Sequence, residues 1–414
     1  MDFILKNGII VTQNKKREVI EGDILIEDGK IKKVGNYSES EAKIVIDLNK
    51  KIVLPSFINT HFHLGETIYK GLIKKMKLDD YIKKTEEMWK KVKNKKFVQN
   101  STVNYSLLEL IKSGTSLFVA ARNWENVKKS NLKAFLGYPI MLSDKLSTYL
   151  KDFPEKFDKT FEEFNSNNIK VGIWLHSLPF LNEKILEMIS EKFYEYDNIF
   201  LTIHINETLD ERKKVKEVYG EYPIEVMESY KLISSRTLLV HCVHVDENEI
   251  QIIKKNNANV SFCPISNVFL KNKLPPIKKF LEKGIKISLA SDGLATGKTC
   301  NLLSIANFSY EHYNLDHQKL LDLITIDAAK CLGVEKEVGS IEVGKSADFV
   351  FFNNKFHVFS KQSLIKKIIS LSPAPEDLLV NGKFLMKNKK VFLNEKRIIS
   401  DFKKAREQIC IGNI

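Results

Sequence analysis

The chain of 414 residues is 43% hydrophobic and 28% charged, which is typical of a globular protein with one large core or two smaller ones. This composition excludes a disordered chain, a collagen and a small disulfide-stapled domain. The net charge of +13 comes from lysines spread along the whole sequence, a pattern that indicates solvated helix faces and argues against a nucleic-acid partner.

The first 53 residues are predicted to form short β-strands with no helix between them. Turn signals at Asn7-Gly8 and Asp28-Gly29 separate the apolar runs. The predicted strands are Phe3–Val11, Gly22–Glu27, Lys30–Val34 and Lys43–Val53.

From Leu54 onward, strand-like apolar runs alternate with stretches of helical periodicity such as Phe97–Lys112, Glu183–Tyr194 and Asp246–Asn256. Eight strands are predicted, the number in a closed parallel barrel, so we expect an α/β chain with a (β/α)8 TIM barrel. These strands are Leu54–Asn59, Ser116–Ala121, Lys133–Met141, Lys170–Leu175, Phe200–Ile205, Thr237–Val240, Asn259–Phe262 and Lys286–Ala290.

The C-terminal part is predicted to contain two helices followed by further strands. The helices are Leu302–Tyr313 and His317–Leu332, and the strands are Asp348–Phe352, Pro375–Val380 and Lys383–Leu393, with a hairpin turn at Asn381-Gly382.

Strands from one chain end alone would leave exposed sheet edges, so both ends are expected to form one small β-sandwich domain. We therefore predict a β-domain from residues 1–53 plus 345–395, a barrel domain over residues 54–344 and a helical tail over residues 396–414.

Four candidate metal ligands lie where predicted barrel strands end. His61 and His63 follow an apolar run, and residues two apart on a strand project to the same side. His204 ends a second apolar run and Asp292 follows a third. In a barrel these ends form the face that carries the active site. Four independent buried polar residues would be costly, whereas three imidazoles and a carboxylate suit Zn²⁺ and also Fe²⁺.

The motifs around these residues resemble those of the amidohydrolase superfamily, and in particular its mononuclear-metal deaminase branch. The first is LPSFINTHFH at residues 54–63. It is followed in order by LTIHINE at 201–207, LVHCVH at 239–244, CPISN at 263–267, SDG at 291–293 and GSIEVGKSAD at 339–348. The resemblance runs from about residue 2 to residue 393. Within that branch, the sequence most resembles the group of 5'-methylthioadenosine/S-adenosylhomocysteine deaminases, guanine deaminases and triazine hydrolases.

The resemblance implies that His61, His63, His204 and Asp292 hold one divalent metal, with zinc favoured and iron as the alternative. It also implies that Glu207 and His241 are catalytic partners. The chemistry agrees with these roles, because a divalent metal lowers the pKa of water. Asp292 is expected to take the proton of the water, His241 to hold the hydroxide, and Glu207 to protonate a ring nitrogen.

One metal is expected rather than two. Binuclear relatives generally use a bridging lysine from the fourth barrel strand, whereas the fourth strand here ends at His176 and begins at Lys170. In the deaminase branch a histidine at this place typically contacts substrate, so the resemblance implies that His176 binds substrate, with a packed loop histidine as the alternative. His244 is expected to play only a structural role.

The expected function is hydrolytic deamination of an amino-purine, an adenosine-type nucleoside or a related N-heterocycle, with release of ammonia. One alternative is a chlorohydrolase or alkylamine hydrolase acting on a triazine-like ring. Another is a catalytically inactive metal-binding barrel, although the retention of Glu207 argues against it. The sequence departs from the family pattern at Ser56, where glycine is usual and the change is small, and also within His176–Phe180 and after Asp292. The family motifs therefore do not fix the substrate.

Further candidates for substrate contacts lie in or near predicted loops of the active face, each with an exposed or packing role as the alternative. They are Glu66, Glu86 or Glu87, Trp89, Arg122 and Lys133. A carboxylate at 86 or 87 would favour a nucleoside, and Trp89 would fit any flat heterocycle.

The expected partner is a small-molecule substrate, with a homodimer possible by analogy with similar proteins. The five cysteines show no CxxC pair, which favours a reducing compartment. No N-terminal signal or apolar run of the roughly 18 residues needed for a membrane span is found, so we expect a cytoplasmic protein without a membrane partner.

Overall fold

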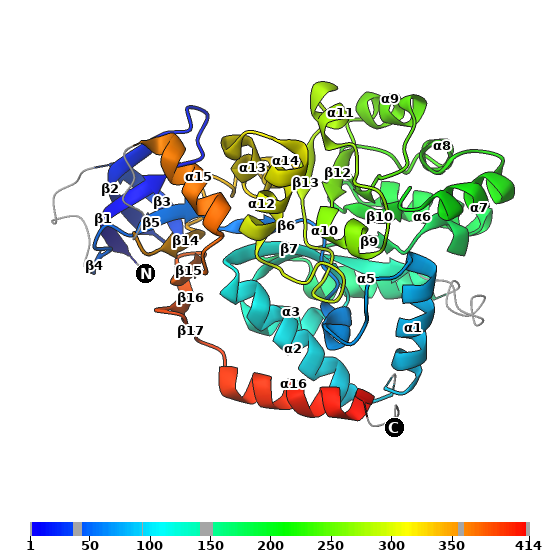
Figure 1. Cartoon of the computed structure of the whole chain (residues 1–414), viewed down its shortest axis with the longest axis horizontal. Helices are drawn as coiled ribbons and strands as arrows, with labels where there is room; N and C mark the ends of the chain where they lie inside the picture. The colour runs from blue at the N-terminus through cyan, green and yellow to red at the C-terminus, as the bar shows by residue number, and fades with distance from the viewer. Residues whose placement is uncertain (1, 36–43, 93, 141–151, 355–359, 411–414) are drawn as a thin grey trace.

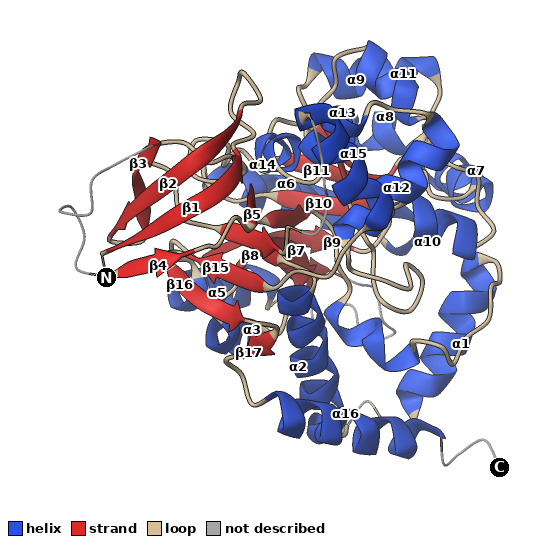
Figure 2. Ribbon diagram, turned by 60° about the vertical axis from the view of Figure 1, so that its left-hand side comes forward, coloured by secondary structure: helices blue, strands red, loops and turns tan. Residues whose placement is uncertain are grey.

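The computed structural model describes residues 2–35, 44–92, 94–140, 152–354 and 360–410. Eight parallel strands form a nearly closed barrel, and a separate nine-stranded sheet is built from both ends of the chain (Figure 1). Figure 2 shows the two units side by side, with helices around the barrel strands. The predicted barrel with a smaller β-unit from the chain ends is therefore confirmed.

The barrel strands pair in chain order, and all the pairs are parallel. The first and last strands meet at the carboxyl end through a bridge between Phe62 and Asp292. The strands are β6 (Phe57–Asn59), β7 (Thr115–Ala121), β8 (Lys133–Ile140), β9 (Ile169–Leu175), β10 (Leu201–Ile205), β11 (Thr237–His241), β12 (Asn259–Phe262) and β13 (Ile287–Leu289).

Helices connect these strands and cover the barrel. Several start at capping residues, such as Asp246, whose side chain accepts from the Glu249 amide while Glu249 reaches back. The helices are α1 (Leu78–Lys90), α2 (Lys96–Lys112), α3 (Trp124–Ser130), α5 (Phe153–Phe164), α6 (Glu183–Glu195), α7 (Leu209–Tyr219), α8 (Pro223–Ser229), α9 (Glu247–Lys255), α10 (Pro264–Phe269), α11 (Ile277–Glu282), α12 (Leu302–Tyr313), α13 (His317–Leu323), α14 (Ile326–Cys331), α15 (Lys361–Leu371) and α16 (Glu395–Cys410), with 3-10 turns η2 (Leu64–Tyr69) and η3 (Leu178–Phe180). Among the described residues, no helix is both long and apolar enough to cross a bilayer.

The second sheet joins the two chain ends through β5 (Ile52–Pro55) and β14 (Phe349–Phe352), which pair antiparallel. It is a single sheet in the order β17-β16-β15-β14-β5-β1-β2-β3, with β4 beside β1. Its remaining strands are β1 (Phe3–Val11), β2 (Val19–Glu27), β3 (Lys30–Gly35), β4 (Val45–Asp47), β15 (Asp377–Val380), β16 (Lys383–Lys387) and β17 (Lys390–Val391).

Three predicted strands are divided in the structure, and one of them, Lys383–Leu393, contains the two short strands β16 and β17, which pair antiparallel. The segment Lys43–Val53 contains β4 and the start of β5, separated by a turn in which Asn49 and Lys50 have positive φ. The segment Leu54–Asn59 is divided at Ser56, because its first two residues complete β5 and only the last three enter the barrel. Lys43 and Met141, at the ends of two predicted strands, lie outside the described residues.

The predicted helix His317–Leu332 is two helices, α13 and α14. The carbonyl of Ile324 accepts a hydrogen bond from the amide of Ile58 in β6 at 3.0 Å, and Thr325 then adopts a non-helical conformation. Pairing with the first barrel strand therefore interrupts the helix. The helical tail is present as α16, and residues 411–414 lie outside the described part.

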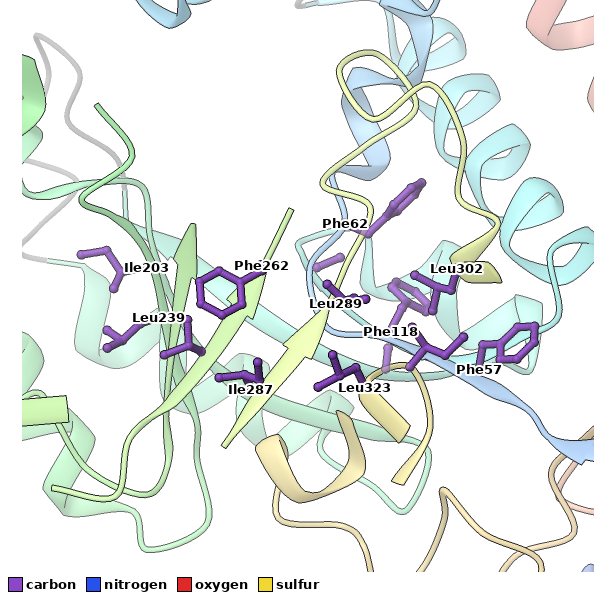
Figure 3. Close-up of a cluster of buried hydrophobic side chains, with 14 of the residues drawn as sticks. Phe57, Phe62, Phe118, Ile203, Leu239, Phe262, Ile287, Leu289, Leu302 and Leu323 are labelled. Atoms are coloured by element: carbon purple, nitrogen blue, oxygen red, sulfur yellow. The ribbon is translucent and has the colours of Figure 1, made fainter. Parts of the chain in front are cut away.

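The core lies between the barrel strands and the surrounding helices, where alternate strand residues point outward. Figure 3 shows part of this layer, in which Leu302 and Leu323 of two helices lie near Ile287 and Leu289 of β13. A separate cluster contains Leu117, Phe135, Trp174 and Phe200. Trp174 stacks on His61, with ring centroids 4.9 Å apart, so this cluster supports the carboxyl face.

Gly172→Ala is expected to destabilise the protein by about 1–3 kcal/mol. Gly172 lies opposite Gly137 in the register of β8 and β9, and a Cβ at residue 172 would overlap the ring and the carbonyl oxygen of Phe200. The free energy of unfolding in urea measures the effect. Gly65→Ala is the matched control because a Cβ there meets no atom within 4 Å. Equal stability of the two variants would contradict the packing argument.

Candidate active site

The side chains of His61, His63, His204 and Asp292 converge at the carboxyl end of the barrel, as predicted. The three histidine Nε2 atoms lie 3.1 Å from one another. Asp292 Oδ1 lies 3.1 Å from Nε2 of His61 and 3.3 Å from Nε2 of His63. A tetrahedral ion with bonds of about 2.0–2.1 Å would separate its ligand atoms by roughly 3.3 Å.

These four residues fit a divalent metal for a second reason. His204 Nδ1 donates to the carbonyl oxygen of His176 at 2.7 Å, which leaves the lone pair of its Nε2 directed at the other two histidines. Neutral imidazoles carry one N–H each, so three Nε2 atoms that face one another cannot satisfy one another well by hydrogen bonds. A shared cation satisfies the three lone pairs and the carboxylate at once. The structure thus supports a divalent metal site.

The strand ends orient these ligands. His61 and His63 flank Phe62, whose amide donates to Val119 O at 2.8 Å and whose side chain is fully buried. Asp292 has φ of 67°, a strained conformation that places the residue beyond β13. The hydroxyls of Ser266 and Thr296 donate to its Oδ2, the second of them at 2.7 Å, so that Oδ1 faces the histidines.

Glu207 and His241, the expected catalytic partners, lie beside this group and close to each other. His241 Nε2 is 3.6 Å from Glu207 Oε2, and both side chains are buried. The rings of His241 and His204 stack with centroids 5.5 Å apart. His241 has φ of 75°, and the Asn267 amide lies 3.2 Å from its Nδ1. The arrangement places one carboxyl and one imidazole next to the metal site.

Burial sets the protonation states of these groups. Burial, reinforced by the charge of Asp292, raises the pKa of Glu207 well above its usual range. Burial also lowers the pKa of His241 to about 4. Burial therefore favours the carboxylic acid form of Glu207, and it keeps the imidazole of His241 neutral near neutral pH. This pair is suited to giving a proton and to accepting a hydrogen bond.

A cavity of about 580 Å³ opens over the metal site. Of the predicted contact residues, Glu66, Glu86, Trp89, Arg122 and His176 line it. Burial lowers the pKa of His176 to about 4, so its imidazole is neutral near pH 7. Lining residues that the sequence analysis missed are Gly65, Tyr69, Leu78, Asp79, Tyr81, Ile82, Thr85, Ser177, Pro179, Phe180, Thr208, Glu211, Lys214, Leu270 and Thr296.

Three other residues lie away from this cavity. Lys133 is the first residue of β8, at the opposite end of the barrel, and its Nζ lies 2.6 Å from Asp348 Oδ2. Its packing role is therefore the correct alternative. Glu87 is exposed and does not line the cavity. His244 does not line it either, and its carbonyl accepts from Arg212 at 3.0 Å.

One pattern in the sequence could have identified some of the cavity-lining residues that were not predicted. Tyr81, Thr85 and Trp89 are spaced four residues apart and lie on one face of α1, so Trp89 as a candidate points to the other two. Tyr69 and Phe180 lie on short 3-10 turns. Such turns leave no periodic pattern in the sequence.

A family model described as the amidohydrolase family matches residues 52–385. The chain is 30% identical over 426 residues to the 5-methylthioadenosine/S-adenosylhomocysteine deaminase of Thermodesulfovibrio yellowstonii, covering 96% of each chain. It is 28% identical over 432 residues to the 5'-deoxyadenosine deaminase of Methanosarcina acetivorans, covering 99% of this chain and 98% of the relative. A solved zinc complex of atrazine chlorohydrolase from Arthrobacter aurescens TC1 has a TM-score of 0.87 and 20% identity, covering 98% of this chain and 100% of that one, which shows a shared fold.

Proposed function

The chain belongs to the amidohydrolase family, and from that premise we propose that it is a metal-dependent hydrolytic deaminase. Its substrate is an amino-purine, an adenosine-type nucleoside or a related N-heterocycle. The names of two relatives that match almost the whole chain support this class. The observation that carries the proposal is that Glu207 and His241 lie beside the four-residue metal site within one cavity.

We propose that the site holds one ion and that the ion is zinc, with Fe²⁺ as the alternative. The donor set of three imidazole nitrogens and one carboxylate oxygen supports zinc, and it suits ferrous iron as well. An ion bound here would act as a Lewis acid that makes water nucleophilic near neutral pH.

The residues of this chain then carry the protons. Asp292 accepts a proton from the attacking water, and its hydrogen-bonded Oδ2 keeps the carboxylate fixed while it does so. His241 holds the attacking oxygen in line with the ring carbon. Glu207, as a carboxylic acid, protonates the ring nitrogen while the carbon–oxygen bond forms. The proton that Asp292 accepted then passes to the amino group. Glu207 takes the proton of the new hydroxyl as the carbon–nitrogen bond breaks, so ammonia leaves with an oxo ring as the product and both carboxyl groups return to their starting states.

We propose that His176 contacts the ring or its substituent. Its imidazole lines the cavity 5.5 Å from the His204 ring and 5.2 Å from the Phe180 ring, measured between centroids. Its carbonyl also fixes His204, so one residue serves both the metal site and the substrate cavity.

The five cysteines are unpaired, which supports the expected cytoplasmic location.

A substrate panel tests the proposal. The zinc-loaded protein is assayed for ammonia with adenosine, 5'-deoxyadenosine, 5'-methylthioadenosine, S-adenosylhomocysteine, adenine and guanine. A chlorotriazine and an alkylaminotriazine are assayed for chloride and alkylamine. Ammonia is expected from at least one adenosine-type compound. Release of only chloride or alkylamine would make the triazine alternative correct, and no turnover by fully loaded protein would favour an inactive barrel.

A further inference from the structure

One ligand of the metal site is linked by side chains to a wall of the substrate cavity. Glu66 Oε1 lies 3.4 Å from His63 Nδ1, on the side of the ring opposite to the ligand atom. Tyr81 donates from its hydroxyl to Glu66 Oε2 at 2.7 Å. Both oxygens of the Glu66 carboxylate therefore have a partner. One contacts His63, which immediately precedes η2, and the other accepts from Tyr81 of α1.

The other ligands are held in different ways. His204 is fixed by a backbone carbonyl, Asp292 by two hydroxyls, and the His61 ring by stacking on Trp174. The side chain of His63 is 22% exposed, compared with 0% for His61 and 7% for Asp292. A ligand on the open side of the site has the greatest need of a partner that sets its ring orientation.

Tyr81 is well anchored, so it can transmit the position of its helix. It is 4% exposed and belongs to a cluster that also contains Tyr69, Met88 and Phe402. Phe402 of α16 stacks on Tyr105 of α2 at 4.0 Å between ring centroids. Figure 1 shows α16 below α2, with its C-terminal end toward α1. The C-terminal helix thus packs behind the wall from which Tyr81 reaches Glu66.

We propose that Glu66 and Tyr81 are positioning residues that orient the His63 ring for the metal. Through them, the affinity of the site for the metal depends on the position of α1. A carboxylate that accepts from the second ring nitrogen of a histidine ligand fixes its tautomer and makes it a better donor. The hydroxyl of Tyr81 fixes the carboxylate in turn. The same helix contributes Ile82, Thr85 and Trp89 to the cavity. A substrate that shifts α1 would therefore change the affinity for the metal, and the metal would change the affinity for the substrate by the same factor.

This inference rests on the metal site of the proposed function but not on deamination, and metal affinity tests it without any substrate. Zinc affinity is measured by competition with a chromophoric chelator for Glu66→Ala, Tyr81→Phe and the double variant. Loss of the outer partner of a ligand typically weakens binding by about 10–100-fold, and we expect this for Glu66→Ala. Tyr81→Phe is expected to cause a smaller loss.

The double variant distinguishes a chain from two separate contributions. If Tyr81 acts through Glu66, then Tyr81→Phe has no further effect once residue 66 is alanine, and the double variant binds zinc like Glu66→Ala. Glu66→Gln is expected to fall between wild type and Glu66→Ala, because an amide oxygen still accepts a hydrogen bond. The visible spectrum of the cobalt-loaded proteins should change in Glu66→Ala, since the His63 ring is no longer held.

Tyr219→Phe is the matched control. Its hydroxyl donates to the Leu181 carbonyl at 2.7 Å, away from the cavity lining, and zinc affinity should match wild type. Circular dichroism of the metal-free variants confirms that each one folds. Wild-type affinity and cobalt spectrum in Glu66→Ala would overturn the proposal, and so would additive losses in the double variant. If the affinities follow the expected pattern while the substrate panel shows no turnover, the proposed deaminase function is wrong and the positioning role of Glu66 and Tyr81 is still supported.

Discussion

The Glu207→Gln variant is expected to lower kcat by about 10²- to 10⁴-fold, the usual contribution of a positioned general acid or base. Glutamine keeps the size of the side chain but has no proton that can be transferred. Because Glu207 is not one of the four converging ligands, the variant should bind zinc as tightly as wild type. Single-turnover kinetics together with metal analysis by mass spectrometry measure both properties.

The pH dependence of kcat is a second test of the role of Glu207 as an acid. Burial and the nearby charge of Asp292 raise the pKa of Glu207, so the active acid form persists to a higher pH than in an ordinary glutamate and is lost as the pH rises through the raised pKa. Wild-type kcat should therefore fall on the alkaline side. This decline should be absent in Glu207→Gln, because the titrating group is gone.

Glu217→Gln is the matched control for this experiment. Glu217 lies on the same helix that follows Glu207, but it is exposed and does not line the cavity, so kcat should stay at the wild-type value. If Glu207→Gln kept more than a third of wild-type turnover, another group would have to supply the proton. The proposed mechanism would then be wrong in its central step.

The metal site was predictable because it depends on the ends of regular elements. Strand periodicity located the ends of β6, β10 and β13, and parallel strands of a barrel bring their carboxyl ends together. His61, His63, His204 and Asp292 could therefore be grouped although they lie far apart in the chain. The role of Glu207 was implied by the resemblance of LTIHINE at residues 201–207 to the family motif, and its position three residues after His204 agreed with that role.

The remaining details depend on contacts that no local pattern encodes. The break between α13 and α14 arises because Ile324 O accepts from Ile58, a residue more than 200 positions earlier. Lys133 was wrong as a cavity candidate although the predicted strand already began at this residue, because the first residue of a barrel strand lies at the end opposite to the active face. Its partner Asp348 lies in the segment that leads into the terminal sheet. Side chains such as Tyr81 and Glu66 meet across a loop and a helix, so sequence spacing alone did not pair them.

Removal of the divalent metal is expected to abolish turnover and to lower stability. The three facing Nε2 atoms and Asp292 Oδ1 are then left without their shared partner, in a site where His61 is fully buried. An ion that binds only the folded state contributes RT ln(1 + [L]/Kd), which is about 2.7 kcal/mol when free metal is 100 times Kd. Thermal unfolding and deaminase activity are measured after dialysis against a chelator and again after Zn²⁺ or Fe²⁺ is added back.

A ligand variant makes this experiment specific. His61→Ala should have low activity with or without metal, and its unfolding temperature should no longer respond to micromolar zinc, because one of four ligands is missing. Recovery of wild-type activity with Zn²⁺ but not with anaerobic Fe²⁺ would assign zinc as the working ion, and the reverse result would assign iron. Full activity in protein shown to be free of metal would contradict the entire site. A chain that lacks the ion has three mutually facing imidazoles and a buried carboxylate, but nothing among them that makes water a nucleophile at neutral pH.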